Sequence, residues 1–265
     1  MWEFGLRWPF GVTVTTVISL GAVTDIGKVR KSNQDTYCAL VGDDVPVGID
    51  ALVAVADGMG GGPAGDVASA LAIEGLIEGV ALALKGPGSP TADELEEALS
   101  GVLGNINANV YQASQESGRR GMGTTLTVAV VAGAAFVVGN VGDSRAYGVS
   151  EGRIRHISVD HSWVEEQVST AAMTREQAER HAYRNMLTRC IGPSPNVRVD
   201  TFAGTLESGD ALFLCSDGLY RLVNDAEVEH AVASTGPQQA CEELVDMANA
   251  RGGIDNITAV ALRVT

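Results

Sequence analysis

The sequence predicts an α+β fold in which helices and antiparallel sheets form separate layers. Tight turns join short runs of β-branched residues within 125–141 and 145–157, which is typical of antiparallel strands. Two amphipathic helical patterns follow each other directly at about 66–84 and 91–118, and a second helix pair precedes the last strand. This order differs from the strict strand–helix alternation of a parallel sheet, so layered sheets and helices are expected.

The first part of the chain is expected to contain three strands and two helices. Strand patterns occupy 12–21, 36–41 and 51–56. The first helix carries an apolar face that consists of Ile73, Leu76, Val80 and Leu84. The second helix begins at a capping box formed by Thr91 and Glu94. Its apolar face consists of Leu95, Leu99, Val102, Ile106 and Val110.

The second part is expected to contain strands, a polar insertion and the last helix pair. Strand patterns lie at 125–131, 134–141, 145–149, 153–157, 197–202, 211–215 and 257–264. Helices are expected at about 225–234 and 238–249. Residues 158–196 are more polar and contain a capping box at Thr174 and Gln177, so they are interpreted as a flap that interrupts the strands. The flap either shapes substrate choice or is a variable surface insertion.

The length of the chain allows one large domain or two small ones. The 265 residues are 45% hydrophobic and 19% charged, which allows a sizeable core and excludes global disorder. The net charge of −15 argues against nucleic acid or an anionic membrane as a partner.

The expected location is the cytoplasm. The sequence shows no signal-peptide pattern, and no apolar run reaches the roughly 18 residues of a membrane span. Its four cysteines are scattered without C-x-x-C spacing, which is typical of reduced thiols.

Aspartates stand at the edges of five expected strands. Asp57, Asp143 and Asp217 each end an apolar run, whereas Asp35 and Asp255 each precede a strand. If these edges converge, the carboxylates repel one another, and a hard cation such as Mg²⁺ or Mn²⁺ relieves that repulsion. The histidines show no metal-ligand spacing, which counts against zinc. One aspartate beside glycine or serine is an ordinary turn residue, but five at strand edges favour a metal site.

The glycine-rich turn at 60–65 allows another interpretation, because it matches the G-x-G-x-x-G dinucleotide fingerprint. That fingerprint requires a strand–helix–strand unit, whereas here a second helix follows the first. A P-loop is excluded because no Gly-Lys-Ser/Thr follows. Cys215 lacks the C-x5-R phosphate cradle of the cysteine phosphatases and is interpreted as a small buried residue.

Six short motifs occur in a recognisable order. They are Arg30-x4-Asp35, Asp57-Gly58-Met59-Gly60-Gly61, Gly123-Thr124-Thr125, Gly142-Asp143-Ser144-Arg145, Ser216-Asp217-Gly218 and Asp255-Asn256. From about residue 19 to 265, the chain thereby resembles the metal-dependent protein phosphatases of type 2C in their bacterial form. The resemblance implies a single catalytic domain at 19–265, preceded by a leader of unknown role at 1–18. It also implies an α-β-β-α sandwich, in which two central antiparallel β-sheets are flanked by pairs of helices.

The resemblance also implies a binuclear Mg²⁺ or Mn²⁺ centre at one edge of the sandwich. Asp57 would bridge both ions, and the carbonyl of Gly58 would bind one of them. The other ion would be held by Asp217 and Asp255. A third, weaker ion would be bound with the help of Asp143.

Two further residues take roles from the same resemblance. Asp35 would bind metal through ordered water, and Arg30 would grip the substrate phosphate, which suits a forked guanidinium. Asn256 caps or orients its loop. Two positions depart from the family pattern. Gly62 replaces a histidine of many bacterial relatives, and Met59 stands where animal relatives carry a candidate general acid. A metal-bound water is therefore the hypothesis for the proton donor.

The expected function is metal-dependent hydrolysis of phosphoserine and phosphothreonine in proteins by a metal-activated water. The expected partners are proteins phosphorylated by bacterial-type serine/threonine kinases. One alternative is a non-catalytic module of the same fold that binds phosphoproteins or a kinase, although the intact acid set argues against it. Another alternative is a hydrolase of a small phosphate ester, which greater activity on free phosphometabolites than on phosphopeptides would favour.

Overall fold

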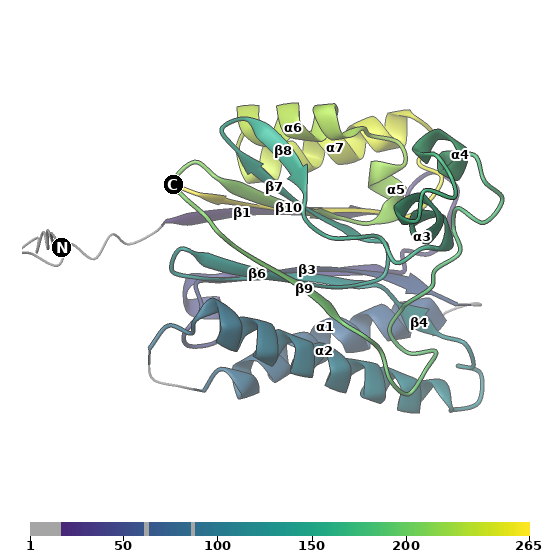
Figure 1. Cartoon of the computed structure of the whole chain (residues 1–265), viewed down its shortest axis with the longest axis horizontal. Helices are drawn as coiled ribbons and strands as arrows, with labels where there is room; N and C mark the ends of the chain where they lie inside the picture. The colour runs from purple at the N-terminus through teal and green to yellow at the C-terminus, as the bar shows by residue number, and fades with distance from the viewer. Residues whose placement is uncertain (1–16, 61–63, 86–87) are drawn as a thin grey trace, which may run out of the picture.

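Two antiparallel sheets lie face to face between two layers of helices (Figure 1). The computed structural model describes residues 17–60, 64–85 and 88–265. The predicted α-β-β-α sandwich is confirmed. Most of the expected leader at 1–18 and the centre of the glycine-rich turn lie outside the described residues, and the division at residue 19 stays a prediction. In the described part of the chain, no helix is both long and apolar enough to cross a membrane.

The first sheet has the strand order β2-β3-β5-β6-β9, with β4 paired to the end of β3. Its strands are β2 (Asp35–Val41), β3 (Ala51–Met59), β4 (Gly123–Thr124), β5 (Leu126–Ala132), β6 (Ala135–Val141) and β9 (Asp200–Thr205). The helices α1 (Ala64–Ala83) and α2 (Ala92–Ser114) cover its outer face (Figure 1). Because β3 pairs antiparallel with both neighbours and α1 leads into α2, the dinucleotide-binding interpretation is excluded.

The second sheet has the strand order β1-β11-β10-β7-β8. Its strands are β1 (Ile18–Asp25), β7 (Arg145–Ser150), β8 (Arg153–His156), β10 (Ala211–Cys215) and β11 (Ile257–Val264). The helices α6 (Asp225–Ser234) and α7 (Pro237–Ala250) cover its outer face (Figure 1). The short helix α5 (Asp217–Tyr220) follows β10 directly, and the short turn η1 (Gly42–Asp44) follows β2.

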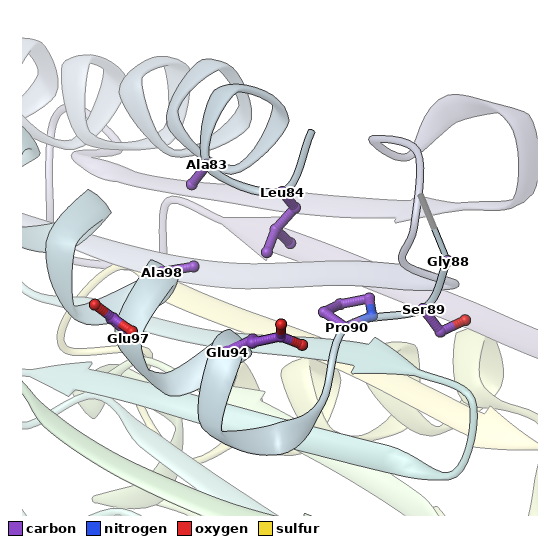
Figure 2. Close-up of a pocket in the computed structure, with 8 residues that line it drawn as sticks. All are labelled: Ala83, Leu84, Gly88, Ser89, Pro90, Glu94, Glu97 and Ala98. Atoms are coloured by element: carbon purple, nitrogen blue, oxygen red, sulfur yellow. The ribbon is translucent and has the colours of Figure 1, made fainter. Parts of the chain in front are cut away.

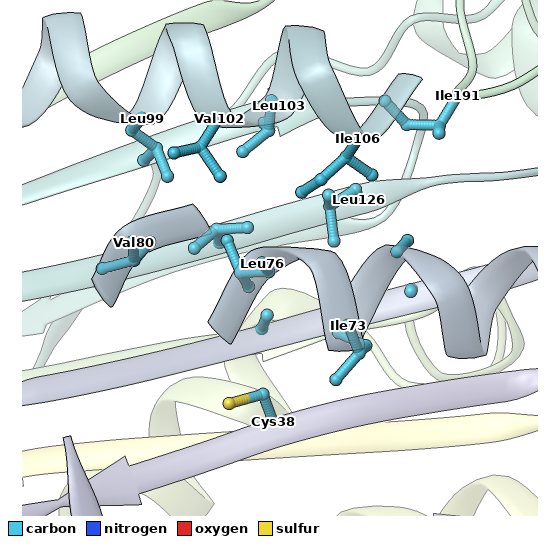
Figure 3. Close-up of a cluster of buried hydrophobic side chains, with 14 of the residues drawn as sticks. Cys38, Ile73, Leu76, Val80, Leu99, Val102, Leu103, Ile106, Leu126 and Ile191 are labelled. Carbon is cyan, nitrogen blue, oxygen red and sulfur yellow. The ribbon is translucent and has the colours of Figure 1, made fainter. Parts of the chain in front are cut away.

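The apolar run of β3 is continuous because both faces of this strand are buried. Leu52 and Ala54 face the helices, whereas Val53 and Val55 pack against the opposite sheet. Figure 3 shows the core under the helices, where Leu76 of α1 and Leu99 and other side chains of α2 point toward the sheet. Fully burying one such side chain contributes about 1.5–3 kcal/mol, so this packing holds the strand ends in place.

Both expected capping boxes are confirmed. Thr91 accepts a hydrogen bond from the backbone of Glu94 and Glu94 bonds back, and Thr174 and Gln177 do the same at α4 (Arg175–Glu179). The flap also contains α3 (Trp163–Ser169), which the periodicity did not predict. The flap lies at the end of the sandwich that also carries β4 and α5 (Figure 1).

Several predicted boundaries are wrong, among them the end of β3, which lies at Met59 and not at residue 56. β1 ends at Asp25 and not at residue 21, because its last residues pair with β11. α2 ends at Ser114 and not near residue 118; Gly118 has a positive φ of 85°. β9 begins at Asp200 and not at residue 197, because Val197 and Val199 pack against the helix-side core without joining the sheet.

Candidate metal centre

The five aspartates predicted from the strand edges lie at the same end of the sandwich. Asp35 and Asp57 are direct partners in the register of β2 and β3. Burial raises the pKa of Asp57 well above its usual value, and the nearby charges of Asp35, Asp217, Asp143 and Asp255 raise it further. The convergence that the sequence predicted is therefore present.

Asp35 is buried, and hydroxyl groups from the second sheet bind one of its two oxygens. Its Oδ2 atom accepts hydrogen bonds from the hydroxyls of Ser216 and Thr258, each at 2.7 Å. Its Oδ1 atom is buried without a hydrogen-bond partner. Burial raises the pKa of Asp35 to about 7, and the two hydroxyl bonds only partly counter that. One carboxylate oxygen is thus left to face the site.

The Gly-Thr-Thr motif fixes the backbone of Asp57. The hydroxyl of Thr125 accepts the Asp57 N–H at 2.9 Å, and the hydroxyl of Thr124 donates to the Asp57 carbonyl at 3.0 Å. Close packing requires glycine at position 58, because a Cβ there would lie 2.3 Å from the carbonyl oxygen of Gly65. Only glycine lets the start of α1 approach the end of β3 so closely.

The flap holds the backbone that precedes Asp143. The N–H of Gly142 donates to Nδ1 of His161 at 3.0 Å, so His161 carries its proton on Nε2 and donates it to Asp200 at 3.1 Å. Arg189 binds the same carboxylate through both terminal nitrogens. His161 is 1% exposed and both its ring nitrogens have partners, so it supports the loop and is not placed to donate a proton to substrate.

Asp143 and Asp217 share an arginine that sequence reasoning did not single out. Nη2 of Arg221 lies 2.9 Å from Oδ2 of Asp217 and 3.5 Å from Oδ2 of Asp143. The hydroxyl of Tyr220 also reaches Oδ2 of Asp143, at 3.3 Å. Burial is the main reason why the pKa of Asp143 rises to about 7, and Arg221 counters it. The only sequence signal was two large polar side chains directly after Ser-Asp-Gly-Leu.

Arg145, the last residue of the Gly-Asp-Ser-Arg motif, has a supporting position. Its guanidinium forms a bidentate ion pair with Asp160 and lies 3.7 Å from the centre of the Tyr220 ring. This cation–π contact holds Tyr220 against Asp143.

Arg30 and Asp255 form an ion pair of 2.6 Å at the solvent-exposed side of the site. Arg30 is half-exposed, so its guanidinium is accessible from solvent. Asn256 orients the loop that carries Arg30: its amide donates to the carbonyls of Ile26 and Ser32, and its Oδ1 accepts the N–H of Gln34. Of the two roles expected for Asn256, these hydrogen bonds show loop orientation.

Gly218 brings the two loops of the second sheet together. A Cβ at this position would lie 2.0 Å from the carbonyl oxygen of Asn256. The start of α5 and the start of β11 therefore touch through backbone atoms, which sets the spacing between Asp217 and Asp255.

The donor chemistry fits a hard divalent cation. In the described residues, no three His, Cys, Asp or Glu side chains are arranged as a ready-made metal-binding group, and arginines engage Asp217 and Asp255. The unpartnered Oδ1 of Asp35 and the raised pKa values of Asp57 and Asp143 nevertheless mark uncompensated negative charge. Carboxylate oxygens are the ligands that Mg²⁺ and Mn²⁺ favour.

Two other features lie away from this chemistry. A cavity of about 400 Å³ at the α1–α2 connection is lined by Leu84, Pro90 and Glu94 among others (Figure 2), at the end of the sandwich opposite the flap. Cys215 is fully buried in the core beneath α6 and α7, and burial raises the pKa of its thiol, so it is not a nucleophile.

An acid cluster at the edge of a two-sheet sandwich defines a class of metal-dependent hydrolases, and comparison with known proteins identifies the family. A family model described as protein phosphatase 2C matches residues 28–250. The serine/threonine phosphatase stp of Listeria innocua is 37% identical over 243 residues, which cover 89% of this chain and 92% of the relative. The chain belongs to the protein phosphatase 2C family.

Solved structures agree with this assignment. The serine/threonine phosphatase of S. agalactiae matches with a TM-score of 0.84 at 29% identity, covering 94% of this chain and all of that one. The catalytic domain of the serine/threonine phosphatase PstP, solved in complex with two manganese ions, matches with a TM-score of 0.78 at 30% identity, covering 95% of this chain and all of that one.

Proposed function

We propose that the acid site hydrolyses phosphoserine and phosphothreonine in proteins. The chain is a metal-dependent protein serine/threonine phosphatase of the 2C type. The observation that carries this conclusion is the convergence of five aspartates from both sheets: Asp57 lies near the charges of the other four, and one oxygen of Asp35 is buried without a hydrogen-bond partner. Membership in the family supplies the reaction class.

The metal ligands follow from the motifs and the geometry together. Asp57 and the carbonyl of Gly58 lie at the end of β3, whereas Asp217 follows β10 and Asp255 precedes β11 of the second sheet. These groups would hold two Mn²⁺ or Mg²⁺ ions, and Asp143 would contribute to a third, weaker site. When bound, such ions supply the positive charge that activates water and stabilises phosphate oxygens. Manganese is the metal reported in the PstP complex.

The side chains around the metal ligands position the reactants. Arg30 would bind two oxygens of the substrate phosphate with its forked guanidinium, and its exposure lets a protein substrate reach it. Asp35 would hold an ordered water on its free Oδ1, because Oδ2 is already saturated by Ser216 and Thr258. The proton donor to the leaving alkoxide would be a water at the site, because His161 is enclosed.

The substrates would be proteins phosphorylated by bacterial-type serine/threonine kinases. Relatives of similar sequence carry the names serine/threonine phosphatase and protein phosphatase, which supports phosphoproteins as the substrate class. The flap lies at the site end of the molecule, so it would contact residues that flank the phosphorylated side chain (Figure 1).

The test is phosphate release from a phosphothreonine peptide with Mn²⁺, with EDTA, and with an Asp217→Asn variant. Release should require Mn²⁺ and should fall at least about 100-fold in the variant, more than the usual effect of losing a ligand's supporting partner. Asp246→Asn on the exposed face of α7 is the matched control and should behave like wild type.

Two results would contradict the proposal. Mn²⁺ binding without release from any phosphopeptide would point to the binding-module alternative. Faster hydrolysis of free phosphothreonine than of the peptide, at equal concentration, would point to a small-ester hydrolase.

A further inference from the structure

Arg221 places a positive charge between two carboxylates of the site. One nitrogen, Nη2, is within ion-pair distance of Oδ2 of both Asp217 and Asp143, at 2.9 Å and 3.5 Å. The Arg221 side chain is only 21% exposed, so water screens these interactions incompletely. The guanidinium therefore offsets part of the negative charge of both acids.

The other end of the guanidinium is bound to the flap. Nη1 of Arg221 donates to Oδ1 of Asn185 at 2.8 Å. Asn185 belongs to the flap, whereas Arg221 follows α5, one helical turn after Asp217. With contacts at both terminal nitrogens, the guanidinium is held in one orientation.

Asp143 receives a second donor on the same oxygen. The Tyr220 hydroxyl lies 3.3 Å from Oδ2 of Asp143, and Arg145 stacks on the Tyr220 ring. A cation bound between Asp143 and Asp217 through their Oδ2 atoms would have to displace Arg221. That displacement breaks the contacts to Asp217 and Asn185 and leaves two positive charges close together.

We propose that Arg221 is a built-in cation that weakens divalent-ion binding between Asp143 and Asp217 and links occupancy of that position to the flap through Asn185. The inference rests on the proposed function, because it takes these two aspartates as metal ligands. It assigns to Arg221 control over how many ions the site holds. Binding at the Asp143–Asp217 position would release Asn185, so the flap would respond to that ion.

The experiment is a calorimetric titration of the full chain with Mn²⁺, comparing wild type with Arg221→Gln. Wild type should bind two ions tightly. Arg221→Gln should bind a third ion with an affinity at least about tenfold higher than wild type shows for it, because a nearby positive charge is lost. Arg221→Lys retains the charge and should remain close to wild type.

Two controls separate a local effect from a general one. Arg153→Gln makes the same charge change at an exposed position of β8, next to the hairpin turn, and should leave the titration unchanged. Asp143→Asn combined with Arg221→Gln should remove the third ion again. An unchanged titration for Arg221→Gln, or an equal gain from Arg153→Gln, overturns the inference.

A milder variant covers the case in which Arg221→Gln does not fold. Asn185→Ala leaves the Arg221 ion pairs in place but removes the flap contact, so it should tighten the third ion by a smaller factor. In wild type, hydrogen exchange at residues 183–187 should rise only at the Mn²⁺ concentrations that fill this third position. Exchange that stays constant across the titration contradicts the link to the flap.

The outcome also separates this inference from the proposed function. If wild type binds Mn²⁺ and hydrolyses phosphopeptide while Arg221→Gln titrates identically, only the inference fails. If wild type binds no Mn²⁺ and releases no phosphate, the proposed function fails, and the inference fails with it.

Discussion

The two sides of the acid site are built in different ways. On the strand side, Asp35 and Asp57 face each other in adjacent strands, and hydroxyls from the other sheet bond Asp35. On the flap side, Asp143 is held through long side chains, chiefly Arg221, and by a loop that His161 supports. Serine and threonine side chains at strands are short and leave a bound carboxylate little room to move. An arginine that contacts an insertion has more rotatable bonds, so the carboxylates it holds can rearrange. The chain therefore combines a rigid half and an adjustable half in one site.

Asp57→Asn tests the rigid half and should have the largest effect. Loss of this carboxylate should lower phosphopeptide turnover by about 10³-fold, because the charge at the centre of the site is lost. In EDTA the same variant should be more stable than wild type, by about 1–2 kcal/mol, because Asn removes a crowded charge. Turnover assays and urea unfolding in EDTA measure the two effects. A variant that loses stability in EDTA would show that the strand side is not crowded by charge.

Thr258→Val should weaken the strand side without changing any aspartate. It removes the 2.7 Å bond to Asp35 together with a 2.8 Å hydroxyl bond to Thr24, and it keeps the side-chain shape. The free energy of unfolding should therefore fall by about 1–3 kcal/mol. Urea denaturation in EDTA measures this loss. Thr205→Val at the exposed end of β9 is the matched control and should change stability little. Equal losses of stability from both variants would show that the hydroxyl bonds to Asp35 stabilise the protein no more than an exposed threonine does.

Arg189→Gln should produce a smaller, pH-dependent loss on the flap side. The hydrogen bond from Arg189 lowers the pKa of Asp200 to about 2. Because the pKa is depressed, the stabilisation is complete above about pH 4 and disappears as the pH falls toward 2. At pH 7 the variant should lose about 1 kcal/mol, since Asp200 is partly exposed, and the difference from wild type should shrink below pH 4.

Urea unfolding at pH 7, 4 and 3 follows this difference. Arg198→Gln is the matched control: Arg198 lies 3.2 Å from the same carboxylate but is 80% exposed, so its loss should have almost no effect. A difference between Arg189→Gln and wild type that grows as the pH falls would contradict the sign of the argument.

The two capping boxes give the smallest expected effects. Thr91→Ala should cost about 1 kcal/mol of global stability, because α2 packs along the core, and should leave turnover unchanged. Thr174 caps a helix of only five residues in the flap, so Thr174→Ala should raise local hydrogen exchange and lower global stability by a smaller amount. Equal global losses would mean that the flap unfolds together with the sandwich.

The sequence predicts the rigid half of the site better than the adjustable half. Asp57 stands where a buried strand meets glycine and Asp35 stands where a strand begins, and such strand ends are visible in the pattern of apolar residues. β10, α6 and β11 occur at the predicted residues for the same reason. Apolar runs bounded by turn residues therefore predicted both the layers and the edge where the acids meet.

The adjustable half depends on contacts between distant parts of the chain. Arg221 and Asn185 are ordinary polar residues in the sequence, and only the folded flap brings them together. Val197 and Val199 show the same limit, because their apolar character predicted a strand, although they pack, partly buried, against the helix-side core without joining the sheet. A one-dimensional pattern records which side chains are buried but not which element buries them.

The backbone contact at Gly218 sets a limit on the sequences that this site tolerates. Even a methyl group there would overlap the Asn256 carbonyl, which lies 2.0 Å from the Cβ position. Any accommodation would push apart the loops that carry Asp217 and Asp255. In a saturation mutagenesis library selected for phosphatase activity, every substitution at this position should be depleted, alanine included. Gly218 thus restricts variation as strictly as the aspartate beside it, although it contributes no side chain.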